Sequence, residues 1–360
     1  MEEATTYKLG DISTMKYGKL PPKHINEGNY PIWSGYRYVG KCNEFNCNKG
    51  DIIIVARGVG GTGDVKIAKE DCYLTNLSIQ VKLDKNLCQP EYFYYSYLLS
   101  NLKYLDSGSA QSQITIEDLK RLEVTLPPLE QQHKITDILK SIDEKIELNR
   151  QINDNLEQQA SSLLSDWIST YPCRTYKLSD ICKYANAKCE TGNLTPQNYI
   201  STENMLPNKK GIVEASNIPT GKATCFKVDD ILIANIRPYF QKIWKADING
   251  GCSADVLCIR ANIESHSPIL YWLLHQDAFF EYVMTGAKGC KMPRGDKQHI
   301  MNWSIDLPEV QYWADLATQL GSIDQQIAYN RIESINLSNL RDTLLPKLMS
   351  GEIKINEIDC

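Results

Sequence analysis

The chain has 360 residues, a net charge of −5 and a hydrophobic content of 42%. This length accommodates two domains of ordinary size, and the hydrophobic content lets each bury a core. No apolar stretch approaches the roughly 18 to 20 residues that cross a bilayer, and the first residues lack the order of a secretory signal. We therefore expect a soluble, cytoplasmic protein without a membrane partner. Twelve cysteines without a C-x-x-C pair indicate free, mostly buried thiols.

The charge is distributed unevenly along the chain. Residues 1–129 carry 15 acidic and 15 basic side chains, and residues 171–308 carry 13 and 16. Residues 130–170 and 309–360 each carry 8 acidic and 4 basic side chains. The first two segments are compatible with contact to a polyanion, although these totals do not demand one.

The sequence repeats one plan twice. The segment YKLGDI at 7–12 recurs as YKLSDI at 176–181, and SIDEKIELNR at 141–150 recurs as SIDQQIAYNR at 322–331. The repeat predicts two halves, each a globular part followed by a long helix, related by an approximate twofold. The expected segments are a first globular domain at 1–129, a helix at 130–170, a second globular domain at 171–308 and a second helix with a tail at 309–360.

Each globular part combines strand-like and helical segments, which predicts a mixed α/β (α+β) fold. In the first part, DIIIVA, VKIA and LSIQVKL are typical of strands, and residues 90–102 are typical of an amphipathic helix. In the second part, DILIAN, QKIWKA and DVLCIRA are the matching strands, and residues 267–284 form the matching helix. The two parts are therefore expected to share one frame.

The two helical segments carry apolar residues at alternating spacings of four and three, the pattern of a coiled-coil seam. Because globular parts alternate with helices, the two helices are expected to pack against each other antiparallel. Asn149 and Asn330 hold equivalent seam positions, where a polar side chain fixes the register unless the helix is locally exposed to solvent. Ser334 and Arg341 interrupt the second seam, and Pro346 is expected to end or kink that helix. The expected seam residues are Ile135, Leu139, Ile142, Ile146, Asn149, Leu156 and Leu163, with Leu316, Leu320, Ile323, Ile327, Asn330, Leu337 and Leu344.

Gly58, Gly60 and Gly63 spell G-x-G-x-x-G directly after the run DIIIVA. A dinucleotide-binding loop of this spelling leads into a helix, whereas DVKIAKEDCYL after Gly63 is typical of another strand. A P-loop would need Lys followed by Ser or Thr where Asp64 stands. The sequence therefore predicts a glycine-rich connection between strands.

The second copy of this stretch, DDILIANIRPYFQKIWKAD at 229–247, has no glycine but keeps an arginine. What the two copies share is Arg57 or Arg237 at the end of a strand. Such an arginine is either a surface ion-pair partner or a reader of guanine edges and phosphate.

No segment carries a recognisable catalytic or metal-binding motif. The Pro-Pro pairs, in KLPPK and TLPPL, lack the flanking residues of a DNA methyltransferase loop. Asp143, Glu144 and Lys145 match the D/E-x-K pattern of nucleases, but they lie between seam residues and are expected on a solvated helix face. The five histidines form no H-E-x-x-H and no Cys/His ligand spacing, so no metal site is expected.

The order of these segments, twice over, resembles the specificity subunit of type I restriction–modification systems. The resemblance covers essentially the whole chain. It is carried by PIWSGYRYVG and GDIIIVARGVGGTG, by DDILIANIRPYFQK and GCKMPRGD, and by LPPLEQQHKITDILKSIDEKIELNRQI. It implies two target recognition domains, each reading one half of a split, asymmetric DNA site, and two long antiparallel helices that set the spacer between the halves.

The resemblance further implies a subunit that catalyses nothing and has no cofactor of its own. Its partners would be double-stranded DNA and two methyltransferase (modification) subunits, which bring S-adenosylmethionine and adenine N6-methylation. The resemblance leaves open whether two restriction subunits, which use ATP and Mg²⁺ for translocation and cleavage, join the complex.

By analogy with the family, DNA-binding residues are expected in loops of both halves. Arginine suits guanine, glutamine suits adenine, aromatic rings stack on bases, and glycine permits close backbone approach. For each residue, a structural role in its loop is the alternative to a base contact. The expected set is Trp33, Ser34, Gly35, Tyr36, Arg57, Gly60, Gln111 and Gln113 in the first half, with Arg237, Tyr239, Gln241, Lys291 and Arg294 in the second.

Three other functions stay open at this point. The chain could be a DNA-recognition module of another modification or defence assembly with the same architecture. A stand-alone methyltransferase would bind S-adenosylmethionine as an isolated chain. A coiled-coil scaffold that never touches DNA would be indifferent to the loss of Arg57 and Arg237.

Overall fold

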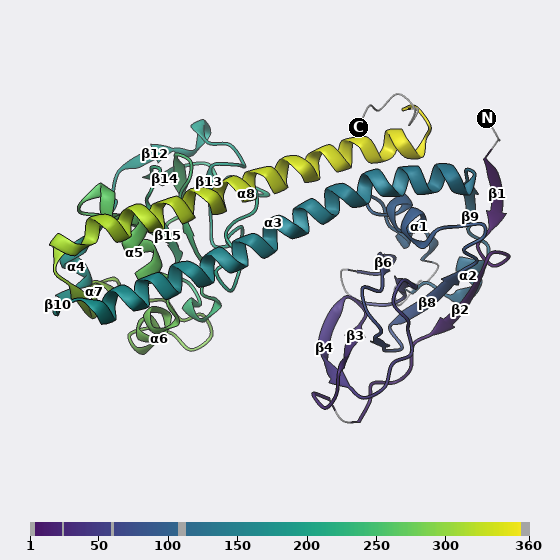
Figure 1. Cartoon of the computed structure of the whole chain (residues 1–360), viewed down its shortest axis with the longest axis horizontal. Helices are drawn as coiled ribbons and strands as arrows, with labels where there is room; N and C mark the ends of the chain where they lie inside the picture. The colour runs from purple at the N-terminus through teal and green to yellow at the C-terminus, as the bar shows by residue number, and fades with distance from the viewer. Residues whose placement is uncertain (1–3, 24, 59–60, 107–112, 354–360) are drawn as a thin grey trace. The chain divides into compact units, whose positions relative to one another are not determined.

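The computed structural model describes residues 4–23, 25–58, 61–106 and 113–353 (Figure 1). The chain divides into two compact units, which we call unit 1 (residues 1–147 and 334–360) and unit 2 (residues 148–333). Two long helices, α3 (Leu129–Thr170) and α8 (Trp313–Met349), each contribute residues to both units. Each unit therefore combines a globular part with adjoining stretches of both helices.

Unit 1 is built on an antiparallel sheet with the strand order β2-β8-β5-β6. Its central strand β5 is buried along its whole length, and its core joins Ile52 and Ile54 to Phe93 of α1, Leu139 of α3 and Leu345 of α8. A smaller sheet, β4-β3-β7, and the pair β1-β9 complete the unit. The elements are β1 (Thr5–Lys8), β2 (Ser13–Tyr17), β3 (Tyr30–Ser34), β4 (Arg37–Cys42), β5 (Ile52–Val55), β6 (Val65–Ile67), β7 (Tyr73–Leu74), β8 (Ser78–Leu83), α1 (Pro90–Ser96), η1 (Leu102–Leu105), α2 (Ile116–Lys120) and β9 (Glu123–Leu126).

Unit 2 repeats this plan with the sheet β11-β18-β15-β16, a second sheet β12-β14-β17-β13 and the pair β10-β19. Its core joins Ile231 and Ile233 of β15 to Phe279 and Phe280 of α6. The elements are β10 (Cys173–Lys177), α4 (Leu178–Ile181), β11 (Cys182–Tyr184), β12 (Lys188–Glu190), η2 (Thr191–Asn193), β13 (Tyr199–Ile200), β14 (Lys222–Phe226), β15 (Ile231–Ala234), η3 (Pro238–Phe240), β16 (Ile243–Lys245), β17 (Gly250–Cys252), β18 (Val256–Ala261), η4 (Glu264–His266), α5 (Ser267–Leu274), α6 (Asp277–Thr285), α7 (Lys297–Met301), β19 (Ser304–Pro308) and η5 (Val310–Tyr312).

The two central sheets have equivalent strand orders, and β1-β9 corresponds to β10-β19, so the predicted mixed α/β fold with an internal repeat is confirmed. The two shorter helices differ from the expectation. The first ends at Ser96, and the second is split into α5 and α6. The split lies at Gln276, whose extended backbone, with a φ of −68° and a ψ of 148°, is outside the α-helical region.

The expected seam residues of α3 and α8 are all buried or half-buried. Leu164, which lies outside the expected set, is more deeply buried than Leu163, because α3 also packs there on the globular part of unit 2. The helix α8 continues through Pro346 to Met349. Proline removes one backbone hydrogen bond, and at this place the helix has only one further turn to form.

Polar side chains fix the register between α3 and α8. In unit 2, Asn149 Nδ2 donates to Glu333 Oε2 at 2.6 Å, and Asn330 Nδ2 donates to Asn153 Oδ1 at 2.8 Å. Asn149 and Asn330 are only 1% and 3% exposed, which excludes local exposure to solvent as the reason for these asparagines. In unit 1, Arg341 pairs with Asp143 at 2.8 Å, so the interruption of the second seam by Arg341 is a polar contact between the helices.

Two further features follow from the described residues. Within these ranges, no helix combines the length and the apolar character that crossing a membrane requires. The cysteines of the same ranges are free thiols, and most of them are buried.

Buried charges attach α8 to the body of unit 2. Asp324 pairs with Lys245 of β16 at 2.7 Å and accepts a hydrogen bond from Trp272 Nε1 of α5 at 2.8 Å. The side chains of Asp324 and Lys245 are 11% and 12% exposed, and burial raises the pKa of Asp324. About two helical turns further along α8, Arg331 pairs with Asp247. The helix is therefore held by specific ion pairs as well as by apolar packing.

Glu157 of α3 should make the stability of unit 2 depend on pH. Burial, together with Asp154, raises its pKa from 4.5 to about 7, against an opposing effect of Lys209. Between pH 4.5 and 7 the folded state therefore binds more protons than the unfolded state, and stability falls as pH rises through this window. We expect Glu157→Gln to be about 2–3 kcal/mol more stable than the wild type at pH 8 and equal to it at pH 4.

The measurement is urea unfolding at several pH values, followed by tryptophan fluorescence. Glu281→Gln, on the exposed face of α6, is the control and should leave the pH profile unchanged. A profile that is the same for Glu157→Gln and wild type would contradict the prediction.

Candidate nucleic-acid interface

In unit 1, Arg57 projects from the end of the buried strand β5. Its backbone N–H and that of Ala56 both donate to Leu77 O, at 3.2 and 2.8 Å. Ile114 N donates to Ala56 O at 3.0 Å, which brings the segment before α2 alongside. The Arg57 Nε is buried without a hydrogen-bond partner among the described residues. The backbone is thus firmly held, while the guanidinium has no hydrogen-bond acceptor among the residues that the structure describes.

The turn between β3 and β4 lies against the same strand end. Gly35 has a φ of +62°, and a Cβ at this position would meet Arg57 O at 3.4 Å. Ser34 Oγ is within 3.2 Å of the Thr75 hydroxyl that donates to it. The Tyr36 ring lies so close to Gly61 that a Cβ there would come within 2.9 Å of it. Trp33 packs on a small buried cluster, so Ser34, Gly35 and Tyr36 are the residues of this turn nearest to the arginine loop.

In unit 2, Arg237 follows β15 by three residues and has a left-handed φ of +53°. Its N–H donates to Pro293 O at 2.8 Å, and Gly295 N donates to Asn235 O at 3.2 Å. Its Nε is also buried without a partner in the described structure. A left-handed non-glycine residue costs energy and often marks a functional loop.

The two arginine loops are built on equivalent backbone contacts. Ala56 meets Ile114 in unit 1, and Ile236 forms a bridge with Arg294 in unit 2. Both residues of the second pair follow their counterparts in the first pair by 180 residues in the sequence. In both units the partner segment then enters a short helix, which Thr115 caps in one case and Asp296 in the other. In each unit, the repeated frame thus brings the arginine loop next to the partner segment, and both contain residues that the sequence predicts to bind DNA.

The arginine loop of unit 2 also presents aromatic rings. Tyr239 and Phe240 are 49% and 37% exposed, with ring centroids 4.7 Å apart. Gln241 follows with a left-handed φ of +50°. Exposed rings next to an arginine are suited to stacking on bases or packing on sugars.

Positive charge accumulates on the partner segment of unit 2. Lys291 is exposed and forms no ion pair within the described residues. Arg294 is also exposed, and its guanidinium lies 3.1 Å from Asp255. Lys288 pairs with Asp296 at 2.7 Å. Asp255 and Asp296 orient two of these cations and leave Lys291 free to contact an anion.

Three expected residues belong to the remaining parts of the unit 1 loops. Gly60 and Gln111 lie outside the described residues. Gln113 is half-buried, and its N–H donates to Asp106 Oδ1 at 2.9 Å. Its backbone therefore has a structural role in the loop next to Ile114.

The structure agrees with a strand connection for the glycine-rich stretch. Gly63, with a φ of +93°, donates to Val55 O at 2.9 Å, and the chain then enters strand β6. In the D/E-x-K triplet, Glu144 and Lys145 are exposed as expected, whereas Asp143 is half-buried between Arg341 and the Tyr95 hydroxyl. Among the residues that the structure describes, no three His, Cys, Asp or Glu side chains are placed to hold a metal ion.

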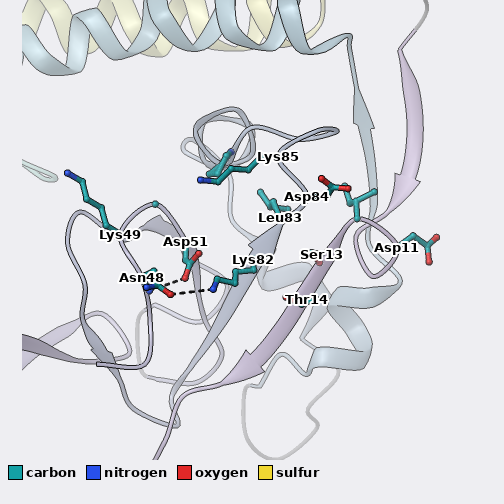
Figure 2. A pocket seen from close by; sticks show the side chains of 13 residues that line it. Asp11, Ser13, Thr14, Asn48, Lys49, Asp51, Lys82, Leu83, Asp84 and Lys85 are labelled. Atoms are coloured by element: carbon teal, nitrogen blue, oxygen red, sulfur yellow. Dashed lines mark hydrogen bonds between the residues drawn. The ribbon is translucent and has the colours of Figure 1, made fainter. Parts of the chain in front are cut away.

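A separate hollow of about 540 Å³ in unit 1 is lined by residues between β2, β5 and β8 (Figure 2). It combines Lys49, Lys82 and Lys85 with Asp11, Asp51 and Asp84. Lys82 Nζ donates to Asn48 Oδ1 at 3.3 Å, as Figure 2 shows. Because the two signs of charge balance, this hollow offers less attraction to a phosphate than the arginine loops do.

Sequence reasoning missed one segment of this surface, residues 207–211 (PNKKG). Asn208 N donates to Phe240 O at 2.8 Å, and Lys209 N donates to Gln241 O at 2.9 Å. The local signal was a turn composition with two lysines, but nothing in the sequence indicates which loop this turn contacts.

Comparison with known proteins shows similarity to one family. Residues 1–158 match the family model described as the type I restriction modification DNA specificity domain. The MjaIX specificity subunit of Methanocaldococcus jannaschii is 24% identical, over 98% of this chain and 94% of its own length. The EcoDI specificity subunit of Escherichia coli is 20% identical, over 97% of this chain and 88% of its own length.

A solved structure shows the same fold. The type I restriction-modification system S subunit from M. genitalium superposes with a TM-score of 0.61 at 20% identity, over 96% of both chains. Family model, full-length relatives and fold agree with the duplicated plan and the two long helices. Residues 1–158 therefore match the type I restriction modification DNA specificity domain, and the whole chain is similar to type I restriction enzyme specificity subunits.

Proposed function

We propose that the globular part of each unit reads one half of a bipartite, asymmetric DNA site, through the arginine loop and its partner segment. The observation that carries this proposal is the duplicated frame. Arg57 and Arg237 lie at equivalent strand ends, and neither Nε has a hydrogen-bond partner in the described part of the chain. A guanidinium can donate two hydrogen bonds to the O6 and N7 of guanine. Two units that share one frame but differ in their loop residues can read two different half-sites, as an asymmetric site requires.

The surroundings of the two arginines support different half-sites. Arg57 is surrounded by the glycine-rich loop and the turn with Tyr36. Arg237 lies beside Tyr239 and a partner segment with Lys291 and Arg294. The bases that one unit contacts therefore cannot be transferred to the other.

As a specificity subunit, the chain is non-catalytic, and catalysis belongs to partner subunits. We propose that α3 and α8 set the spacer between the half-sites and dock two methyltransferase subunits, which supply S-adenosylmethionine and adenine N6-methylation. The acidic excess of the helical segments supports this division, because it disfavours contact with the duplex and leaves these surfaces to protein partners.

Arg57→Ala and Arg237→Ala should each weaken recognition of one half-site only. The loss of a bidentate contact costs about 1–3 kcal/mol and relaxes specificity at the base concerned. The test requires the bipartite site, which mapping of methylated adenines in the source genome provides. Binding of the modification complex is then measured on duplexes in which one half-site at a time is altered.

Arg121→Ala and Arg174→Ala are the matched controls, because both are exposed arginines outside the arginine loops and should leave recognition unchanged. Equal losses at both half-sites for either loop variant would contradict the assignment. Unchanged recognition in both variants would favour a scaffold that does not touch DNA.

A further inference from the structure

The segment 207–211 and the arginine loop of unit 2 form one continuous backbone structure. Besides its bonds to Phe240 and Gln241, the segment is closed by a hydrogen bond of 2.8 Å from Leu206 N to Gly211 O. Asn208 and Lys209 have left-handed φ values of +56° and +62°. Of the six described non-glycine residues with positive φ, four therefore lie in these two loops, with Arg237 and Gln241. Such a concentration of backbone strain persists only where surrounding contacts hold it.

Asp277, at the start of α6, fixes the side chain of Lys209 in this segment. Lys209 Nζ lies 2.6 Å from Asp277 Oδ1, and the Lys209 side chain is only 16% exposed. Lys209 is the main cause that lowers the pKa of Asp277. The carboxylate thus fixes Lys209, whose own N–H donates to Gln241 O of the arginine loop.

The two neighbouring lysines of the segment differ in their surroundings. Lys209 is turned inward to Asp277. Lys210 is exposed and has no ion pair within the described residues. The exposed rings of Tyr239 and Phe240 belong to the loop that the segment supports. A free ammonium beside such rings is suited to a phosphate, because lysine offers a point charge without the planar fork that reads a base edge.

We propose that residues 207–211 are a further part of the DNA-binding surface of unit 2. In this assignment Lys210 contacts a backbone phosphate of the duplex. Asp277 is a positioning residue that holds Lys209 and, through the backbone bond of Lys209 to Gln241, the arginine loop. The assignment rests on the proposed function, since it requires that unit 2 binds DNA. It adds a sequence-independent contact and a carboxylate that acts on specificity without touching DNA.

The phosphate contact is tested by the salt dependence of binding. The modification complex with the full chain is titrated with a duplex that lacks the bipartite site, at several salt concentrations. Lys210→Ala should lower the slope of log K against log salt by about 0.9, the change for one phosphate contact. Lys183→Ala, an exposed lysine of β11 without an ion pair in the described structure, is the control and should keep the wild-type slope.

An unchanged slope for Lys210→Ala, or an equal decrease for Lys183→Ala, overturns the phosphate contact. A wild-type complex that binds no DNA through this subunit overturns the proposed function and this assignment together, so the two failures are distinguishable. A reduced slope for Lys210→Ala alone supports it.

The positioning role is tested with Asp277→Asn on the mapped bipartite site. We expect a loss of about two- to fivefold in discrimination at the half-site of unit 2, the range of a partly exposed ion pair, with the other half-site and the salt slope unchanged. Lys209→Met should give a similar loss, and the double variant should lose less than the product of both, because the two residues act as one pair. Asp277→Glu should restore discrimination.

A merely structural role for Asp277 predicts a different pattern. In that case unfolding of unit 2 shifts, and discrimination stays at the wild-type level when measured on the folded complex. That pattern, or equal losses at both half-sites, overturns the positioning role.

Discussion

Removal of residues 144–150 from α3, together with the facing residues 332–338 of α8, should change the spacer of the DNA site and leave both half-site sequences unchanged. One heptad keeps the seam on the same face, because seven residues complete almost two helical turns. The deletion shortens each helix by about 10 Å, so the spacer should contract by no more than about three base pairs. Asp143 with Arg341 and Asn153 with Asn330 remain on either side of the deleted stretch.

The effect on the original site should be large, since specific binding exceeds non-specific binding by about 10³-fold or more. Binding of the modification complex is measured on a series of duplexes with fixed half-sites and varied spacers. A variant in which the same heptads are replaced by other heptads of equal length is the control and should keep the original spacer. An unchanged spacer in the deletion variant would end the role of the helices in setting this distance.

Asp324→Ala should destabilise unit 2 by about 2–3 kcal/mol, because it leaves a buried indole N–H without its acceptor and a buried lysine with one carboxylate in place of two. The substitution leaves Lys245 with Asp229 alone, at 3.0 Å, and removes the acceptor of Trp272 Nε1. Urea unfolding is followed by tryptophan fluorescence, to which unit 2 contributes every tryptophan of the chain except Trp33.

Asp315→Ala, at an exposed position of the same helix, is the matched control and should cost no more than about 1 kcal/mol. A loss below this value for Asp324→Ala would show that apolar packing alone attaches α8 to unit 2. The predicted difference between the two variants thus separates the ion pair from the helix itself.

The repeat made much of the fold accessible from the sequence. The buried strands β5 and β15 are short apolar runs, and each is followed by an arginine. Because the second copy has the arginine but no glycine, the comparison argued against a nucleotide-binding loop at the glycines of the first copy. The heptad pattern located α3 and α8 because such a pattern extends over many residues. Signals that are long, or that occur twice, are strong enough to outweigh local ambiguity.

Features that depend on distant contacts escaped sequence reasoning. The segment 207–211 meets residues 240 and 241 through backbone hydrogen bonds, and backbone atoms leave no trace in residue type. The break at Gln276 falls in the polar run HQD at 275–277, which is also compatible with one continuous amphipathic helix. Leu164 is buried more than Leu163 because the body of unit 2 covers a face of α3 that the partner helix does not. In each case tertiary structure decides between local alternatives of similar energy.

The asparagine contacts between α3 and α8 restrict how this protein can diversify. Asn153 bonds to the carbonyl of Ile327 as well as to Asn330, so a slip of one helix by a single turn would leave buried amides without partners. Insertion or deletion of a single residue in one helix would therefore break these contacts. Inherited variation in length should occur in whole repeats on both helices, and the family of DNA sites open to such chains should have spacers that differ in discrete steps.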